Sequence, residues 1–121
     1  MINLTVSLKS NIPIYEQIYD QIAAQILNGK LKPDEILPSI RNVASELSIS
    51  VITVKNAWEQ LAANGFIYTV AGKGCFVAHV DDKLAERKLS IAAERLKNDL
   101  EYYRGLGISL SELKKLIDEN Y

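Results

Sequence analysis

Residues 37–61, LPSIRNVASELSISVITVKNAWEQL, constrain the fold most, because they carry two helical patterns separated by only a few residues. The first pattern covers residues 40–47, and Ser39 stands before it as an N-cap. A turn at residues 48–50 follows, and its last residue, Ser50, is placed to cap the next helix. That second helix ends at an Asn-Gly pair, and its spacing predicts a buried face made of Val51, Val54, Ala57, Trp58 and Leu61.

Two short helices joined by so tight a turn fit a helix-turn-helix, in which the second helix enters the major groove of DNA. The residues expected to face outward from that helix are mostly polar, with one lysine near the N-terminus: Ile52, Thr53, Lys55, Asn56 and Glu59. An ordinary corner between two core helices has the same local geometry. The motif alone therefore leaves both interpretations open.

The flanking segments favour the DNA-binding interpretation. Upstream, Pro13 opens a helix, IYEQIYDQIAAQIL, that stays apolar on one face until Asn28-Gly29 ends it. Downstream, FIYTV and CFVA enclose AGKG, which predicts a β-hairpin. Three helices and a hairpin make a winged helix-turn-helix, with Gly72 allowing close backbone approach at the wing tip and Lys73 supplying a cation. A nucleotide-binding loop is disfavoured, because the G-x-x-x-x-G-K-[ST] spacing is absent.

The C-terminal third has a different character and predicts a helical arm. From residue 81 to residue 104 a charged helix carries an apolar seam with steps of three and four: Ala85, Leu89, Ala92, Leu96, Leu100 and Tyr103. Ser109 and Glu112 form a capping box for a last short helix. Self-association would cover these apolar faces, although folding back onto the winged domain would also do so. The expected domains are residues 1–78, for DNA binding, and residues 79–121, for dimerisation.

Composition excludes several function classes. One cysteine and one histidine provide neither a disulfide nor a metal site, and no Ser/His/Asp or Cys/His set suggests an enzyme. No cofactor is expected. Neither a membrane span nor a signal peptide is apparent, so a cytoplasmic protein is expected. The formal net charge of −1 requires any DNA-binding surface to be a local patch, on which Arg41, Lys55 and Lys73 converge.

At this point the chain resembles a known family. The pattern LPSIR-x-VA-x-EL-x-IS-x-x-TV, continued by GKG-x-FV, is similar to the winged-helix domain of GntR-family bacterial transcription regulators over about residues 12–78. The two-helix tail resembles the YtrA-type subfamily, in which a small dimerisation arm replaces a large effector domain. The resemblance implies a dimeric repressor of a pseudo-palindromic operator, and a neighbouring transporter operon as its target. A winged helix that only binds other proteins is the alternative.

The resemblance also implies roles for individual residues. Arg41 would grip the DNA backbone or a base edge, and the wing tip at Gly72 and Lys73 would enter the minor groove. The other residues expected to contact DNA belong to the two helix starts: Ser39, Ser50, Val51, Ile52, Thr53, Lys55 and Asn56. The chain departs from the family pattern in having Asp34 where glycine is usual. Apolar Val51 and Ile52 replace common polar residues, which suggests contact with thymine methyl groups.

Overall fold

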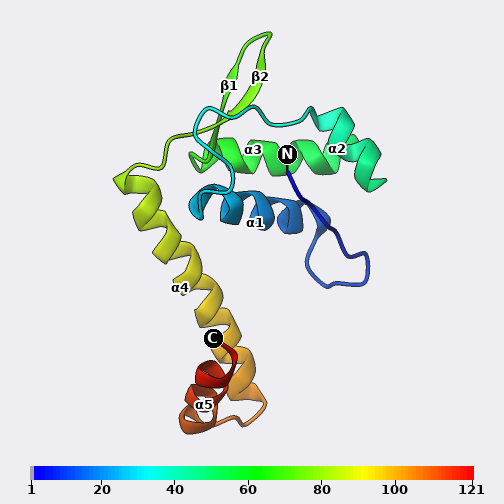
Figure 1. Ribbon diagram of the computed structural model, residues 1–121. Helices are drawn as coiled ribbons and strands as arrows, with labels where there is room; N and C mark the ends of the chain where they lie inside the picture. The colour runs from blue at the N-terminus through cyan, green and yellow to red at the C-terminus, as the bar shows by residue number, and fades with distance from the viewer. Residues whose placement is uncertain (1) are drawn as a thin grey trace. The chain divides into compact units, whose positions relative to one another are not determined.

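A computed structural model describes residues 2–121 (Figure 1), and Met1, at the start of the expected first domain, lies outside the described residues. The chain divides into two compact units, one extending to Ala85 and the other covering residues 86–121. The elements, in chain order, are α1 (Ile14–Leu27), α2 (Ile40–Leu47), α3 (Val51–Ala63), β1 (Ile67–Val70), β2 (Gly74–Val77), α4 (Asp82–Gly105) and α5 (Leu110–Asn120). This order confirms the predicted winged helix followed by two C-terminal helices.

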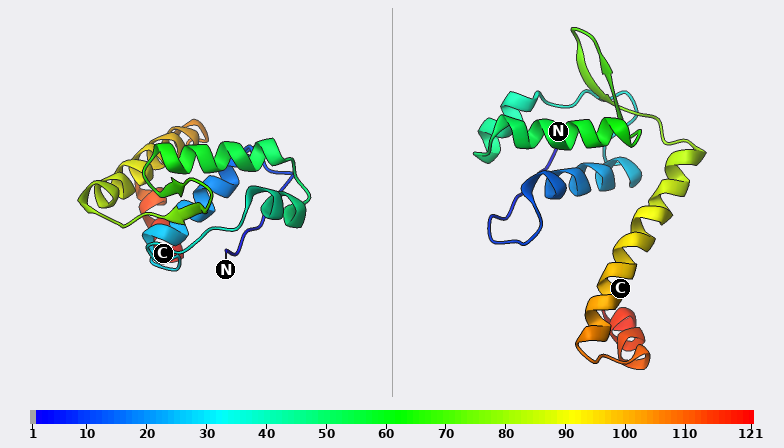
Figure 2. Two further views of the ribbon diagram at one scale, coloured as in Figure 1. Left: turned by 90° about the horizontal axis from the view of Figure 1, so that it is seen from above. Right: turned by 180° about the vertical axis from the view of Figure 1, so that it is seen from behind.

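Three helices of the first unit enclose its core. α1 runs beside α3, and α2 packs against α3 near the N-terminal end of that helix (Figures 1 and 2). Ile18, Ile22 and Ile26 of α1 meet Val54, Ala57, Trp58 and Leu61 of α3 in one buried cluster. Since these positions follow the helical repeat of each segment, the apolar patterns in the sequence predicted which face of each helix is buried. Val51 was wrongly assigned to the buried face: it is 46% exposed, because the first turn of α3 extends beyond the core.

The turn of the helix-turn-helix is formed by backbone bonds around Ser48. Its φ of +56° is in the left-handed region, which L-residues other than asparagine and aspartate rarely adopt. The Ile49 N–H reaches back to the carbonyl of Ala44 at 3.0 Å, and the Ser48 N–H reaches Ser45 at 3.3 Å. These bonds satisfy the last carbonyls of α2 and set the direction in which α3 begins.

Replacing Ser48 with glycine is expected to stabilise the protein. A left-handed residue with a Cβ costs roughly 1–2 kcal/mol, and the extra freedom of glycine in the unfolded chain cancels part of that gain. We expect the free energy of unfolding to rise by about 0.5–1 kcal/mol. Urea unfolding, followed through the fluorescence of Trp58, measures it. Ser45→Gly, inside α2, is the matched control and should lower stability; an unchanged midpoint for Ser48→Gly would contradict the strain argument.

The wing is a two-stranded hairpin with a third segment along its edge. β1 and β2 pair antiparallel, with Tyr68 opposite Phe76. The loop at residues 34–37 runs along the free edge of β2: Val77 accepts from the Asp34 N–H at 2.7 Å, and Leu37 donates to Cys75 at 2.9 Å. Ile36 bridges to Phe76 in the same register. The loop that leads into α2 is therefore attached to the wing by backbone hydrogen bonds.

The described N-terminal residues form an extended segment held against α1 by side-chain hydrogen bonds. The amide of Gln21 bonds both backbone groups of Thr5, at 3.0 and 2.6 Å, and the amide of Gln17 bonds those of Ser7, at 2.8 and 3.0 Å. Side-chain amides thus take the place of a neighbouring strand. Leu4 and Val6, which alternate with Thr5 and Ser7, pack partly against the core.

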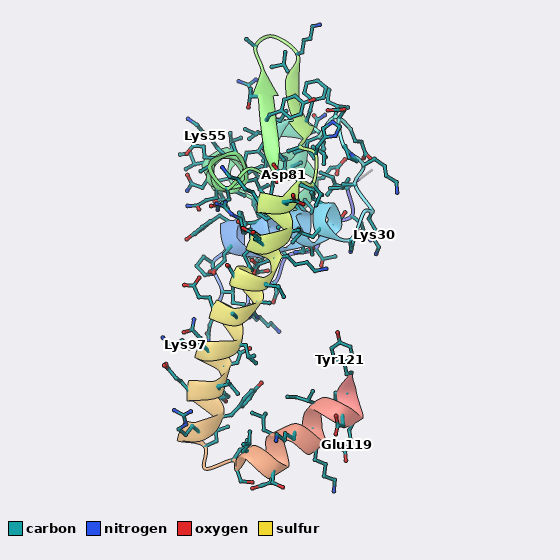
Figure 3. The ribbon with its side chains drawn as sticks, turned by 90° about the vertical axis from the view of Figure 1, so that its left-hand side faces the viewer. Lys30, Lys55, Asp81, Lys97, Glu119 and Tyr121 are labelled. Carbon is teal, nitrogen blue, oxygen red and sulfur yellow. The ribbon has the colours of Figure 1, made fainter. Side chains whose placement is uncertain are left out.

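The second unit contains most of α4 and all of α5. Ser109 and Glu112 form the predicted capping box at the start of α5. The described part of this unit has no buried side chain, since Leu84, the one buried residue of α4, belongs to the first unit. Tyr121 extends into solvent at the end of the chain (Figure 3). None of the helices described is long and apolar enough to cross a membrane.

Candidate nucleic-acid interface

Arg41 is presented in the first turn of α2 by a local cap. The Ser39 hydroxyl accepts the Asn42 N–H at 3.1 Å, which confirms the predicted N-cap and fixes where the helix starts. A surface ion pair with Glu46 or with Asp34 would explain the presence of Arg41 here without any contact to DNA. Neither forms among residues 2–121, and the Asp34 carboxylate is bonded to Tyr68 and His79 instead. The exposed guanidinium is therefore available to a ligand.

The start of α3 presents both apolar and polar groups. Ser50 caps the helix by accepting the Thr53 N–H at 3.1 Å, and the two hydroxyls lie 2.9 Å apart. The Thr53 side chain is thus held in one orientation. Ile52 is 70% exposed beside it, together with Val51. Burying such apolar surface against a ligand is favourable, and two neighbouring exposed branched side chains at a helix start fit thymine methyl groups.

Farther along α3 the outward face is polar. Lys55 projects into solvent (Figure 3) and lies 3.9 Å from Glu59 one turn later. Both side chains are well exposed, so this ion pair contributes little to stability. Lys55 can therefore leave Glu59 and bind a phosphate instead. Asn56 is also exposed. The structure therefore places these two expected DNA contacts on the surface of α3.

The wing tip is a tight turn that exposes a lysine. The Lys73 N–H donates to the carbonyl of Val70 at 3.0 Å, and Gly72 has a φ of +75°, which a residue with a Cβ would adopt only with strain. The Lys73 side chain is exposed and makes no ion pair within the described part of the chain. Glycine at the turn allows the backbone to approach a surface, and the lysine brings a positive charge to it.

A groove connects Arg41 with Lys73. It has a volume of about 370 Å³ and runs between the loop before α2, α3 and the start of β2; we call it the Arg41–Lys73 groove. Its lining is largely apolar and includes Ile36, Pro38, Trp58 and Cys75. Arg41 and Lys73 also line it. The sequence predicted the two cations but missed the apolar lining. The sequence signal for this lining is the apolar Ile36 directly before Leu37-Pro38-Ser39, and the structure shows this side chain 57% exposed.

Comparison with known proteins identifies the family. Residues 14–77 match the family model described as bacterial regulatory proteins, gntR family, which is more than half of the chain. The chain belongs to the GntR family. It is also 33% identical over 112 residues to the HTH-type transcriptional repressor YtrA of Bacillus subtilis, covering 92% of this chain and 86% of that protein. This match confirms the YtrA-type assignment. A longer relative is 38% identical over 95 residues, and the chain spans 39% of its length.

Solved structures agree with the family. The crystal structure titled transcriptional antiterminator from Listeria monocytogenes EGD-e superposes with a TM-score of 0.80 at 38% identity, covering 97% of this chain and 88% of that one. The DNA-binding domain of AraR in complex with the operator ORE1 matches 63% of this chain and 93% of its own, with a TM-score of 0.53 at 29% identity. GntR-family proteins are DNA-binding transcription regulators and not enzymes, which confirms the expectation that this chain is not an enzyme.

The expected dimerisation seam lies along α4 of this GntR-family protein. Leu89 and Leu96 are 72% and 51% exposed, Ala85 and Ala92 are exposed, and Leu100 and Tyr103 are half-buried. Ala85 ends the first unit, and the other five positions belong to the second. Within the second unit, the seam therefore presents apolar surface that its own helices leave largely exposed.

Proposed function

We propose that this protein is a dimeric repressor that acts in the bacterial cytoplasm and reads a pseudo-palindromic operator with Arg41, the start of α3 and the wing tip. The observation that carries the proposal is the Arg41–Lys73 groove, an apolar groove bordered by two cations that make no ion pair within residues 2–121. A DNA strand has complementary chemistry, with sugar and methyl groups along its length and phosphates at regular intervals. The name of YtrA, a transcriptional repressor, supports repression over activation.

The first half of the proposal concerns the reading of DNA by one winged domain. In helix-turn-helix proteins the N-terminal residues of the recognition helix contact base edges. Ile52 and Thr53 occupy that position in α3, one apolar and one carrying a fixed hydroxyl. The wing would supply phosphate or minor-groove contacts through Lys73. Base readout and backbone positioning would then come from different elements.

The second half concerns the dimer. Nine large apolar side chains are at least 36% exposed in the second unit: Leu89, Ile91, Leu96, Tyr102, Leu106, Leu110, Leu116, Ile117 and Tyr121. Helices that bury so little are marginal in water and need a partner. Residues 86–121 carry seven basic and seven acidic side chains, so a second copy would meet no net repulsion. A second copy also supplies the other half-site of a pseudo-palindrome.

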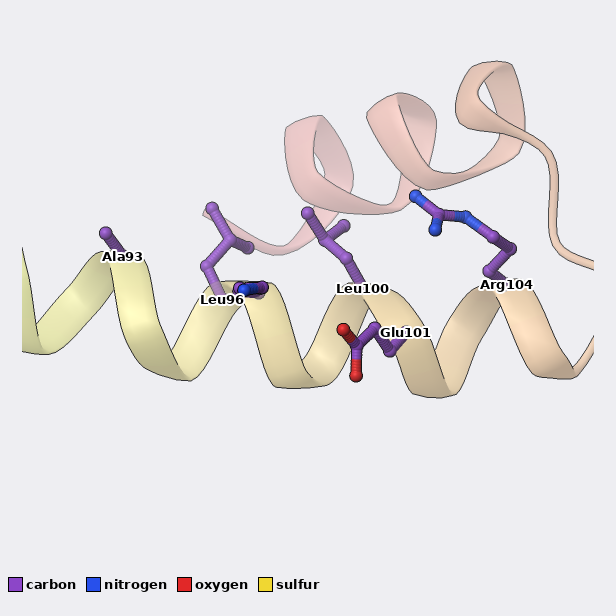
Figure 4. Close-up of a pocket in the computed structure, with 6 residues that line it drawn as sticks. Ala93, Leu96, Leu100, Glu101 and Arg104 are labelled. Carbon is purple, nitrogen blue, oxygen red and sulfur yellow. The ribbon is translucent and has the colours of Figure 1, made fainter.

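A groove on α4 is the proposed place of this contact. Leu96 and Leu100 project from the side of α4 on which α5 lies, and Arg104 follows them (Figure 4). The groove has a volume of about 270 Å³ and remains open to solvent beside α5. Apolar side chains from the arm of a second copy would fill it, as knobs fill holes in a coiled coil.

A winged helix used only for protein–protein assembly is the second candidate, and the exposed apolar Ile36 and Ile52 favour it. Footprinting the purified protein on the DNA upstream of its own gene separates the two. The proposal expects two protected half-sites about one helical turn apart. No protection at any protein concentration would overturn DNA reading. The genes downstream of such a site would test the transporter operon that the resemblance to YtrA-type regulators implies.

Two substitutions should separate the two kinds of DNA contact. Lys73→Ala is expected to weaken binding to operator and random DNA alike, and to reduce the salt slope of the binding constant by about one unit. Thr53→Ala should weaken operator binding more than random binding, because a base contact is lost. Fluorescence anisotropy titrations at several salt concentrations measure both. Equal losses on the two DNAs for Thr53→Ala would contradict its role in base readout.

A further inference from the structure

Asp34 joins three segments of the winged domain that are distant in the sequence. One carboxylate oxygen accepts a hydrogen bond from the Tyr68 hydroxyl at 2.7 Å, and the other lies 2.8 Å from Nε2 of His79. Asp34 belongs to the loop before α2, Tyr68 to β1, and His79 follows β2. We call these three side chains the Asp34 clasp.

The clasp crosses the wing from one edge to the other. The loop at residues 34–37 pairs with β2, and β2 pairs with β1, so that β2 lies between the other two segments. Tyr68 stacks on Phe76 of β2, with ring centroids 5.6 Å apart and planes 21° apart, and its hydroxyl then reaches Asp34 beyond. Backbone pairing leaves β1 and the loop without direct hydrogen bonds to each other among the described residues. The clasp supplies that link.

Asp34 adopts a costly backbone conformation to make this link. Its φ is +68°, in the left-handed region where glycine meets no penalty and aspartate is tolerated. The hydrogen bond from Tyr68, followed by that of His79, lowers the pKa of Asp34 below its ordinary value, and the same bond raises the pKa of Tyr68. A charged acceptor makes the bond from Tyr68 stronger than one between neutral groups. Strain kept at one residue together with a strong side-chain bond points to a role for that side chain.

The clasp affects the relative positions of Arg41 and Lys73, the two cations that border the groove. Arg41 follows the loop through the Ser39 cap, and Lys73 is carried by the hairpin tip. A two-stranded hairpin is only marginally stable by itself and twists readily. We propose that the Asp34 clasp positions the wing, setting Lys73 against Arg41 across their groove for DNA binding. This inference rests on the proposed DNA-reading function and adds three positioning residues to it.

Two substitutions at Asp34 give a matched test. Asp34→Asn and Asp34→Gly both remove one negative charge and both allow a positive φ. Only asparagine keeps an oxygen for the Tyr68 hydroxyl and an amide for His79. Asp34→Gly is expected to bind operator DNA roughly two- to tenfold more weakly than Asp34→Asn, from the loss of these hydrogen bonds. Its urea midpoint should stay close to that of Asp34→Asn, because the relief of backbone strain by glycine offsets the loss of these exposed hydrogen bonds. Equal affinities would overturn the inference.

A double-mutant cycle tests whether the effect passes through the wing tip. Tyr68→Phe removes only the hydroxyl and keeps the ring on Phe76, and Tyr15→Phe, which removes a hydroxyl that makes no hydrogen bond within residues 2–121, is the control. Operator affinity is measured for Tyr68→Phe, Lys73→Ala and the double variant. If the clasp positions Lys73, the double variant binds about as weakly as Lys73→Ala alone. Losses that multiply, or a Tyr68→Phe variant that binds like wild type, would overturn the inference.

The design separates failure of this inference from failure of the proposed function. A Lys73→Ala variant that binds as tightly as wild type would contradict the wing-tip contact itself. The comparison of Asp34→Gly with Asp34→Asn would still decide the role of the clasp, because it does not involve Lys73. In the converse outcome, Lys73→Ala binds weakly while Asp34→Gly and Asp34→Asn bind operator DNA equally well. That result would support the wing-tip contact and refute the positioning role of the clasp.

Discussion

Replacing both Leu96 and Leu100 with glutamate is expected to convert the proposed dimer into a monomer and to weaken operator binding by about 10²–10⁴-fold. Both leucines border the groove on α4, where an ionised carboxylate would be moved from water into an apolar contact at high cost. Linking two DNA-binding modules raises overall affinity by about 10²–10⁴ over one module, and the monomer loses that gain. Light scattering with a binding titration measures both effects.

A control on the same helix distinguishes a charge placed in the seam from a charge placed elsewhere on α4. Asn98 lies two residues from each leucine, on the opposite side of α4, so Asn98→Glu adds a charge away from the seam. This variant should remain dimeric and bind DNA normally. Trp58, the one tryptophan of the chain, is buried in the winged domain and reports whether that domain stays folded. A wild-type protein that is monomeric at micromolar concentration would contradict the dimer.

The segments that the sequence predicted well are those specified by their own residues. α2 begins and ends where Ser39 and the helical spacing of its apolar residues indicated, and α5 begins at its capping box. The hairpin followed from two β-rich runs around AGKG, since that tetrapeptide contains the glycines that the turn requires. In each case the signal lies within a few residues of the structure that it specifies.

The features that the sequence did not predict are side-chain contacts between distant segments. Gln17 and Gln21 hold the N-terminal residues 10 and 16 positions away, and Asp34 reaches residues 34 and 45 positions away. No periodicity records such contacts, because polar residues on a surface have many possible partners. Asp34 stands where the family pattern usually has glycine, but only the folded chain shows which groups its carboxylate meets.

The candidate site was predicted in part for the same reason. Arg41 and Lys73 belong to recognisable local motifs, a capped helix start and a glycine-rich turn. That the two border one groove depends on the loop at residues 34–37 pairing with β2, which is a tertiary contact. Ile36 entered the site only through this pairing. The sequence therefore indicated which residues carry charge to the interface, whereas the fold determines the apolar surface between them.

Arg41 is expected to contribute more to specific binding than any other single side chain of the interface. It is exposed at the start of α2, borders the groove shared with Lys73 and has no ion-pair partner in residues 2–121. A guanidinium can hold a phosphate or a guanine edge with two parallel hydrogen bonds, a geometry that the ammonium group of lysine cannot reproduce. Arg41→Lys should therefore bind operator DNA more weakly than wild type although the charge is kept.

Arg41→Ala should bind more weakly still, by about 1–3 kcal/mol in total if a guanine is the partner. Titrating labelled operator with the wild type, Arg41→Lys and Arg41→Ala at one salt concentration gives the order of affinities. Lys30→Ala, which removes a positive charge from the same unit at a residue outside the groove, is the control for charge alone. The same titrations on random DNA distinguish the two possible partners, because a lost phosphate contact weakens both DNAs equally, whereas a lost guanine contact weakens the operator more. An Arg41→Ala variant as tight as wild type would make Arg41 an ordinary surface residue, and DNA reading would then depend on α3 and the wing alone.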